Sequence, residues 1–179
     1  HRTGEEAILT ALAAPAEMAF VDTPLADVIQ YLADQHRIEI VLDAKALEDV
    51  GVGKDSPISI QLRGIPLRSA LALTLERLGL DWTIDHDVLL ITTPEATSSR
   101  LTTKVYEVGD LVAVLDEKNQ PWDDFDSLVE AITSTVDPVG WDTVGGPGSI
   151  APLAFAGGRT LVVAQTQRTH EQIAKLPKD

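Results

Sequence analysis

The chain has 179 residues, of which 44% are hydrophobic, which is enough to bury one core or two small ones. Its 28 acidic and 14 basic residues give a formal net charge of −14, and acidic residues outnumber basic ones on both sides of residue 95. This charge argues against a nucleic-acid or anionic-membrane surface. The chain has no cysteine, which excludes disulfides and thiolate metal sites.

Residues 1–17 form an N-terminal extension. Its most apolar run, Ala7–Ala14, follows Glu5 and Glu6 and is too short to cross a bilayer. We therefore expect a short helix in this extension and no membrane span in the chain.

Residues 18–93 contain an internal repeat with an offset of 42 residues, since "TPLADVIQYLADQHRIEIVLD" has the same layout as "IPLRSALALTLERLGLDWTID". Each copy shows helical spacing after its proline and then the alternation typical of a strand. The segments "MAFVD" and "ISIQLRG" predict a strand before each helix, and "VLLITT" completes a hairpin. We expect the order βαββαββ, with both repeats sharing one sheet and a short helix at Ala44–Val50.

Residues 94–103, "PEATSSRLTT", are polar and begin with proline, so we interpret them as a linker. Residues 104–179 then form a second module with the order βαββα. It contains a strand at "KVYEV", a loop at "LDEKNQPWDD", a helix after Asp124 and a last helix after Thr166. A short added strand is expected at Trp141–Val144. The predicted fold class is thus α+β, with two small α/β-sandwich modules.

No motif predicts a catalytic, cofactor or metal site. "GVGKDS", Gly51–Ser56, lacks the earlier glycine and the Ser or Thr after lysine that a phosphate-binding loop needs. "DEKNQPWDDFD", Asp116–Asp126, lacks the central glycine and ligand spacing of a calcium loop. The histidines lack metal-ligand spacing, and no nucleophile can be paired with a base. We expect Asp123, Asp124 and Asp126 to stabilise a helix N-terminus instead.

The stretch "WDTVGGPGSI", Trp141–Ile150, has three glycines and a proline in four positions. Its G-x-x-G pattern is that of a KH nucleic-acid clamp, but it leads from a helix into a strand and has no lysine or arginine nearby. We interpret the loop as a shaped connector. If it makes a contact, we expect protein binding through Trp141, Val144 and Ile150.

Two segments carry a resemblance to a known family. "FVDTPLADVIQYLADQHRIEIVLD" and "ISIQLRGIPLRSALALTLERLGLDWTIDHDVLLIT" resemble the secretin and TonB short N-terminal (STN) module, except that Asp87 stands where the closing hairpin commonly has glycine. "KVYEVGDL", "DFDSLVEAITSTV" and "TLVVAQTQRTHEQIAKL" resemble the N-terminal repeat module of secretins. The glycine loop is longer than the corresponding connection in that repeat.

The resemblance implies a non-enzymatic assembly module of a secretin-like secretion or pilus system in the periplasm or cell envelope. Its partners would be neighbouring subunits or envelope proteins, and the full-length protein would form a homo-oligomer. Three alternatives stay open: a signalling module of a TonB-dependent receptor that contacts an anti-sigma regulator, an acidic-site hydrolase, and a KH-like nucleic-acid binder. The hydrolase requires Asp137 and Asp142, or the Asp123–Asp126 cluster, to converge in a pocket.

Overall fold

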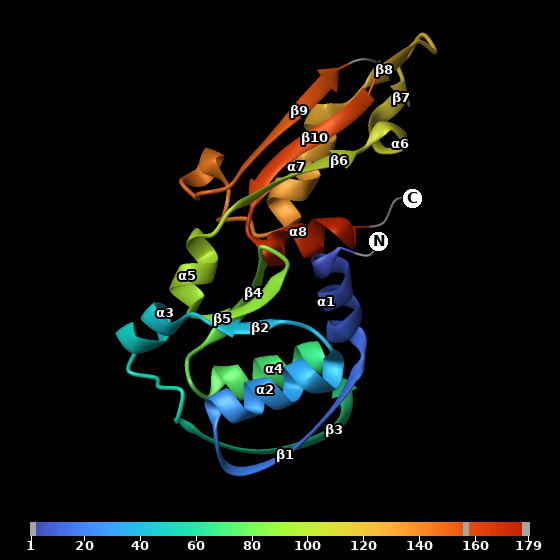
Figure 1. Ribbon diagram of the computed structural model, residues 1–179. Coiled ribbons are helices and arrows are strands. Elements are labelled where there is room, and N and C mark those ends of the chain that lie inside the picture. The colour runs from blue at the N-terminus through green and yellow to red at the C-terminus, as the bar shows by residue number, and fades with distance from the viewer. Residues whose placement is uncertain (1–2, 156–157, 177–179) are drawn as a thin grey trace. The chain divides into compact units, whose positions relative to one another are not determined.

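The computed structural model describes residues 3–155 and 158–176, and the chain divides into two compact units, His1–Thr97 and Ser98–Asp179. We call them unit 1 and unit 2 and describe each by itself. Both combine small sheets with helices, so the α+β class predicted from the sequence is confirmed (Figure 1).

Unit 1 contains, in chain order, α1 (Gly4–Ala13), β1 (Pro15–Pro24), α2 (Leu25–His36), β2 (Ile40–Leu42), α3 (Ala44–Asp49), β3 (Pro57–Pro66), α4 (Leu67–Glu76), β4 (Asp81–Asp85) and β5 (Val88–Thr92). Without α1 and α3, this is the predicted order βαββαββ. The helix α5 (Pro94–Ser99) occupies most of the segment that we interpreted as a linker.

The 42-residue repeat appears in unit 1 as a local two-fold arrangement. Strands β1 and β3 are antiparallel, with Pro15 opposite Pro66 and Pro24 opposite Pro57. In the repeat, Pro15 is equivalent to Pro57 and Pro24 is equivalent to Pro66, 42 positions apart. Replacing each residue by its equivalent therefore turns one of these pairs into the other. The central pair, Ala19 with Gln61, maps onto itself, so the local axis passes through it.

The backbone irregularities obey the same symmetry. Asp22 (φ 47°) and Gly64 (φ 75°) are 42 positions apart, and both lie in the left-handed region, where the β1–β3 register shifts. Glycine adopts this conformation without steric cost, whereas aspartate needs local support. Asp22 has such support because its N–H donates to Ser59 Oγ at 2.9 Å.

The expectation that both repeats share one sheet is wrong. Strands β1 and β3 form a two-stranded sheet, and β2 and β4 join β5 in a second sheet with the order β2-β5-β4. Figure 1 shows α2 and α4 between these two sheets. The reason is that each helix is apolar over a broad surface, so the strands before and after it cover opposite sides. The buried side chains are Leu25, Val28, Ile29 and Leu32 in α2, and Leu67, Ala70, Leu71, Thr74 and Leu75 in α4.

The N-terminal extension contains the expected helix, α1, which starts with a capping box made by Thr3 and Glu6. Ile8 and Leu12 of this helix are buried in the core of unit 1. The turn between β4 and β5 has positive φ at His86 (48°) and Asp87 (63°), as a tight two-residue hairpin turn requires.

Unit 2 contains β6 (Thr102–Glu107), α6 (Gly109–Val112), β7 (Ala113–Leu115), β8 (Pro121–Asp123), α7 (Phe125–Thr135), the 3-10 helix η1 (Asp142–Val144), β9 (Ser149–Phe155), β10 (Gly158–Gln165) and α8 (Gln167–Ala174). Strands β6, β9 and β10 with helices α7 and α8 follow the predicted order βαββα. The sheet order is β6-β10-β9.

Two local expectations for unit 2 are wrong. The segment predicted as a loop, Leu115–Asp124, contains the strand β8, which pairs with β7 so that Val114 lies opposite Trp122. The strand expected at Trp141–Val144 is instead η1, because the glycines that follow turn the chain back on itself. A single bridge between Trp141 and Gly148 is all that remains of strand pairing there.

Candidate interaction surface

The N–H groups of the glycine loop are already used inside unit 2. They donate to nearby carbonyl oxygens: Asp142 to Gly148 (2.7 Å), Val144 to Trp141 (3.0 Å), Gly145 to Asp142 (3.1 Å), Gly146 to Trp141 (2.8 Å) and Gly148 to Gly140 (2.8 Å). A loop that cradles an anion needs its N–H groups free and convergent. This network supports our interpretation of the loop as a shaped connector.

Close backbone approach explains the glycines at positions 146 and 148. A Cβ atom on Gly146 would lie 2.5 Å from the carbonyl oxygen of Val139 and 2.6 Å from the nitrogen of Trp141. A Cβ atom on Gly148 would lie 2.8 Å from the carbonyl oxygen of Gly140, which also accepts a 2.9 Å bond from Gln165 Nε2. Neither position has room for a side chain.

Trp141, which we expected at an interface, is fully buried in the core of unit 2 (0% exposed). Its role is to anchor the loop, so it is not available for a partner. Ile150 is partly buried and packs against the same core. Val144 is 63% exposed, and its contact with a partner stays a prediction.

Two of the acidic residues considered for a hydrolase, Asp123 and Asp124, have structural partners in unit 2. Asp124 caps α7 by accepting a 3.0 Å bond from Ser127 N–H. The Ser127 side chain, and after it this N–H, lowers the pKa of the Asp124 carboxyl by hydrogen bonding. Asp123 forms a 2.8 Å ion pair with Arg159. Within residues 3–155 and 158–176, no group of three His, Cys, Asp or Glu side chains is placed to hold a metal ion.

The three histidines of the described residues lie apart from one another, and each has its own neighbouring groups. His170 is buried, with Nε2 at 2.6 Å from the carbonyl oxygen of Thr102 and Nδ1 at 2.7 Å from the Tyr106 hydroxyl. Since a carbonyl oxygen only accepts, Nε2 carries a hydrogen and donates it to Thr102. Burial lowers the pKa of His36, and His86 is exposed beside Asp85.

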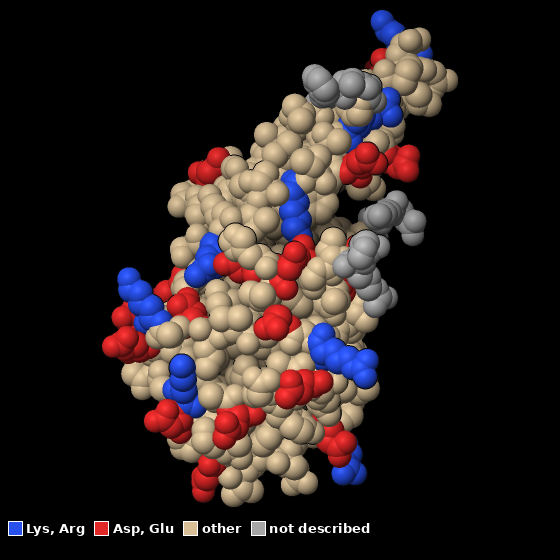
Figure 2. Space-filling view, viewed as in Figure 1, with Lys and Arg blue, Asp and Glu red and all other residues tan. Residues whose placement is uncertain are grey.

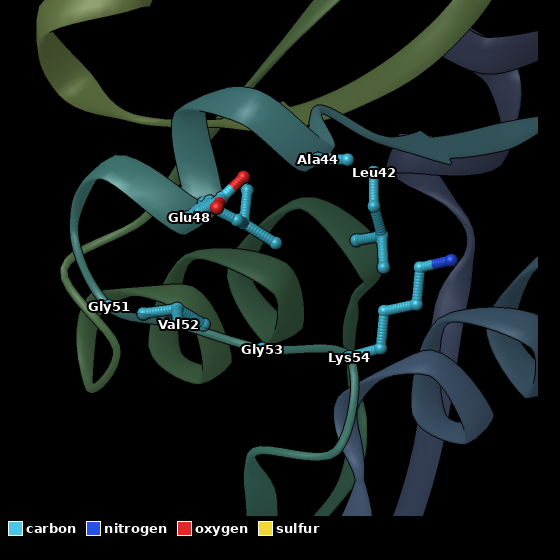
Figure 3. Close-up of a pocket in the computed structure, with 8 residues that line it drawn as sticks. Leu42, Ala44, Glu48, Gly51, Val52, Gly53 and Lys54 are labelled. Carbon is cyan, nitrogen blue, oxygen red and sulfur yellow. The ribbon is translucent and has the colours of Figure 1, made fainter.

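The phosphate-loop motif of unit 1 lies beside an open pocket of about 370 Å³ (Figure 3). Its lining is mostly apolar and comes from β2, α3 and the following loop: Leu42, Ala44, Leu47, Glu48, Gly51, Val52, Gly53 and Lys54. The N–H groups of Gly51, Val52 and Gly53 donate to Glu48, Leu47 and Ser56, respectively. They therefore do not converge on a phosphate.

The strongest candidate for a contact surface is one face of the sheet in unit 2. Figure 1 shows α7 on one side of β6, β9 and β10, and no other described helix or strand of unit 2 lies over the opposite side, which we call the uncovered face. On the uncovered face, Val162 in the central strand lies between Val105 of β6 and Ala151 of β9. Val105 is 60% exposed and the neighbouring Leu153 is 47% exposed. Figure 2, seen from the same side, shows mostly uncharged side chains over β9 and β10.

The two edges of this sheet differ in their ability to pair. In an antiparallel pair, the N–H and C=O groups of every second residue point toward the partner strand. Val108 N–H donates to the Arg159 carbonyl of β10 (2.8 Å), so Val108 is one of the residues that point toward β10. The N–H and C=O groups of Thr103, Val105 and Glu107, which alternate with these residues, therefore point away from β10. On the opposite edge, the corresponding outward position of β9 is Pro152, which has no N–H. The edge of β9 is therefore blocked and that of β6 is open.

The sequence analysis did not identify Val105 or the β6 edge. In "TTKVYE" one apolar residue falls on each face of the strand, Val105 on one and Tyr106 on the other. The alternation alone therefore does not say which face is buried. Pro152 was a usable signal, because proline within a strand indicates an edge.

No family model matches this chain, and no curated protein matches its sequence. Among solved structures, XcpQN012 is 14% identical with a TM-score of 0.31; the alignment covers 89% of this chain, which spans only 62% of that one. A dimeric cysteine mutant of the N-terminal domain of the secretin XcpQ from Pseudomonas aeruginosa is 11% identical with a TM-score of 0.33, covering 89% of this chain and 97% of that one. These are distant likenesses.

Proposed function

We propose that this chain is a non-enzymatic protein–protein interaction and assembly module of a bacterial secretin-like secretion or pilus system. The observation that carries the proposal is the uncovered sheet face of unit 2, where Val105, Val162, Ala151 and Leu153 lie side by side. Exposed apolar side chains that are contiguous mark contact surfaces more often than isolated ones do.

The chemistry of this face suits a protein partner. An apolar centre with little charge is typical of the buried part of a protein interface. A nucleic acid or an anionic lipid surface would require basic residues, whereas this chain has a net charge of −14. Among the described residues, no helix has both the length and the apolarity to cross a membrane.

The resemblance to the STN and secretin repeat modules supports a place in the periplasm or cell envelope. The partners would then be neighbouring subunits or other envelope proteins. A signalling module of a TonB-dependent receptor would instead contact an anti-sigma regulator, and the identity of the bound partner separates these two functions.

Site-specific photo-crosslinking in the native host tests the proposal. A photoreactive residue at Leu153 should form adducts with further copies of the protein or with identified envelope secretion proteins. The control position is Glu130, which is exposed on α7 of the same unit. Equal adducts at both positions, or no adduct at Leu153, would contradict a contact through the sheet face.

A further inference from the structure

The open edge of β6 indicates a specific partner strand. We infer that unit 2 self-associates by pairing β6 with β6 of a second copy, antiparallel about a two-fold axis at Val105. This inference deepens the proposed function, on which it rests, because it names a second copy as the occupant of this edge.

The backbone pattern of β6 is self-complementary. Thr103, Val105 and Glu107 present their N–H and C=O groups to the open side, and Val105 is the middle of the three. In an antiparallel pair centred on Val105, each Val105 would face its symmetry mate and each Thr103 would face Glu107 of the other copy. All three outward positions of both strands would then exchange backbone hydrogen bonds.

Other registers are less favourable. Centring the pair on Lys104 or Tyr106 would pair only two of the three outward positions of each strand within β6. The Lys104 register would also place two ammonium groups opposite each other. Centring it on Glu107 would place two carboxylates directly opposite each other, and like charges at opposite positions destabilise strand pairs. The Val105 register instead places each Glu107 opposite a neutral threonine.

The side chains fit the same register. Val105, Val162 and Ala151 form one row across the three strands on the uncovered face. Pairing at Val105 would continue this row into the second copy, so that two three-stranded sheets become one. Such a contact uses the same surface patch on both copies, as a closed two-fold dimer requires. Pro152 interrupts backbone pairing at the other edge, so pairing through the sheet edges would join two copies.

Sedimentation equilibrium of the intact chain at loadings up to about 1 mM tests this inference. We expect a reversible dimer that Val105→Lys weakens at least about tenfold, because two ammonium groups would then face each other across the axis. The matched control is Val139→Lys, at a valine of unit 2 that is 78% exposed and lies outside the sheet, and it should leave the dimer intact. Val105→Pro should also weaken the dimer, because proline has no N–H to donate across the dimer axis. It should leave the sheet of unit 2 folded, because the Val105 N–H does not bond to β10.

Cysteine crosslinking gives a second readout, because the chain has no cysteine of its own. Directly opposed residues in a hydrogen-bonded antiparallel pair have Cα atoms about 5.5 Å apart, within the disulfide range. Val105→Cys should therefore form covalent dimers under mild oxidation much faster than Val139→Cys.

Three results would overturn the inference: a monomeric wild type at all loadings, a dimer unaffected by Val105→Lys, or equal crosslinking at Val105 and Val139. Adducts of Leu153 with other envelope proteins would in that case still support the proposed function. A dimer that forms through β6 while Leu153 forms no adduct with envelope proteins would instead support this inference and contradict the proposed envelope function.

Discussion

The indole Nε1–H of Trp141 donates a 2.8 Å hydrogen bond to the carbonyl oxygen of Val136, in the core of unit 2. The bond ties the residue after α7 to the start of the glycine loop. Since Trp141 is fully buried, both its packing and this bond contribute to stability rather than to partner binding.

Trp141→Phe should lower the unfolding free energy of unit 2 by about 1–3 kcal/mol, because the buried Val136 carbonyl loses its indole donor. Trp141→Ala should cost about 3–5 kcal/mol, since it also leaves a cavity. Val144→Ala, at the exposed neighbour, should stay within about 0.5 kcal/mol of the wild type. Urea unfolding followed by far-UV circular dichroism measures all three, and a stable Trp141→Ala variant would contradict the anchor role.

Gly146→Ala should destabilise unit 2 by about 1–3 kcal/mol, because its Cβ would overlap the backbone of Val139 and Trp141. Gly53→Ala in unit 1 is the matched control, since its Cβ would meet only the Asp55 nitrogen at 3.9 Å. Thermal unfolding of both variants compares the two glycines. Similar stability for the two variants would show that the loop tolerates a side chain and is not held by close approach.

Asp87→Ala should destabilise unit 1 by about 1–2 kcal/mol. Asp87 Oδ1 accepts a 3.0 Å bond from Glu5 N–H at the start of α1, and alanine would lose this bond while keeping the unfavourable positive φ. Asp87→Asn should be close to neutral, because asparagine tolerates this conformation and retains a side-chain oxygen. Amide hydrogen exchange in α1 should rise in the alanine variant alone.

The stability of unit 1 should fall as the pH is lowered from 7 to 5. Burial lowers the pKa of His36 below its ordinary value of 6.5, and its Nε2 has no hydrogen-bond partner among the described residues. Between the folded and unfolded pKa values the unfolded chain binds more protons, so acid favours unfolding. His36→Gln should reduce this pH dependence in urea titrations at several pH values, and an unchanged slope would assign it to other groups.

Much of unit 1 could be predicted because its signals are local and are repeated. Helical spacing after Pro24 and Pro66, and alternation from Ile38 and Leu80, depend only on side-chain period. The same holds for the βαββα order of unit 2. The division of the repeats between two sheets could not be predicted, because a strand's pattern does not say which neighbour supplies its hydrogen bonds.

For the candidate surface too, local sequence patterns predicted some features, and others depended on tertiary packing. The sequence by itself determined the acidic charge, the strands β6, β9 and β10 and the shaped character of the glycine loop, because these depend on composition, period and backbone freedom. Only the tertiary structure decided that Trp141 is buried, that Val105 faces outward and that β6 is the open edge. Burial and edge position depend on which segments pack together across long sequence separations, and no single strand's pattern contains that information.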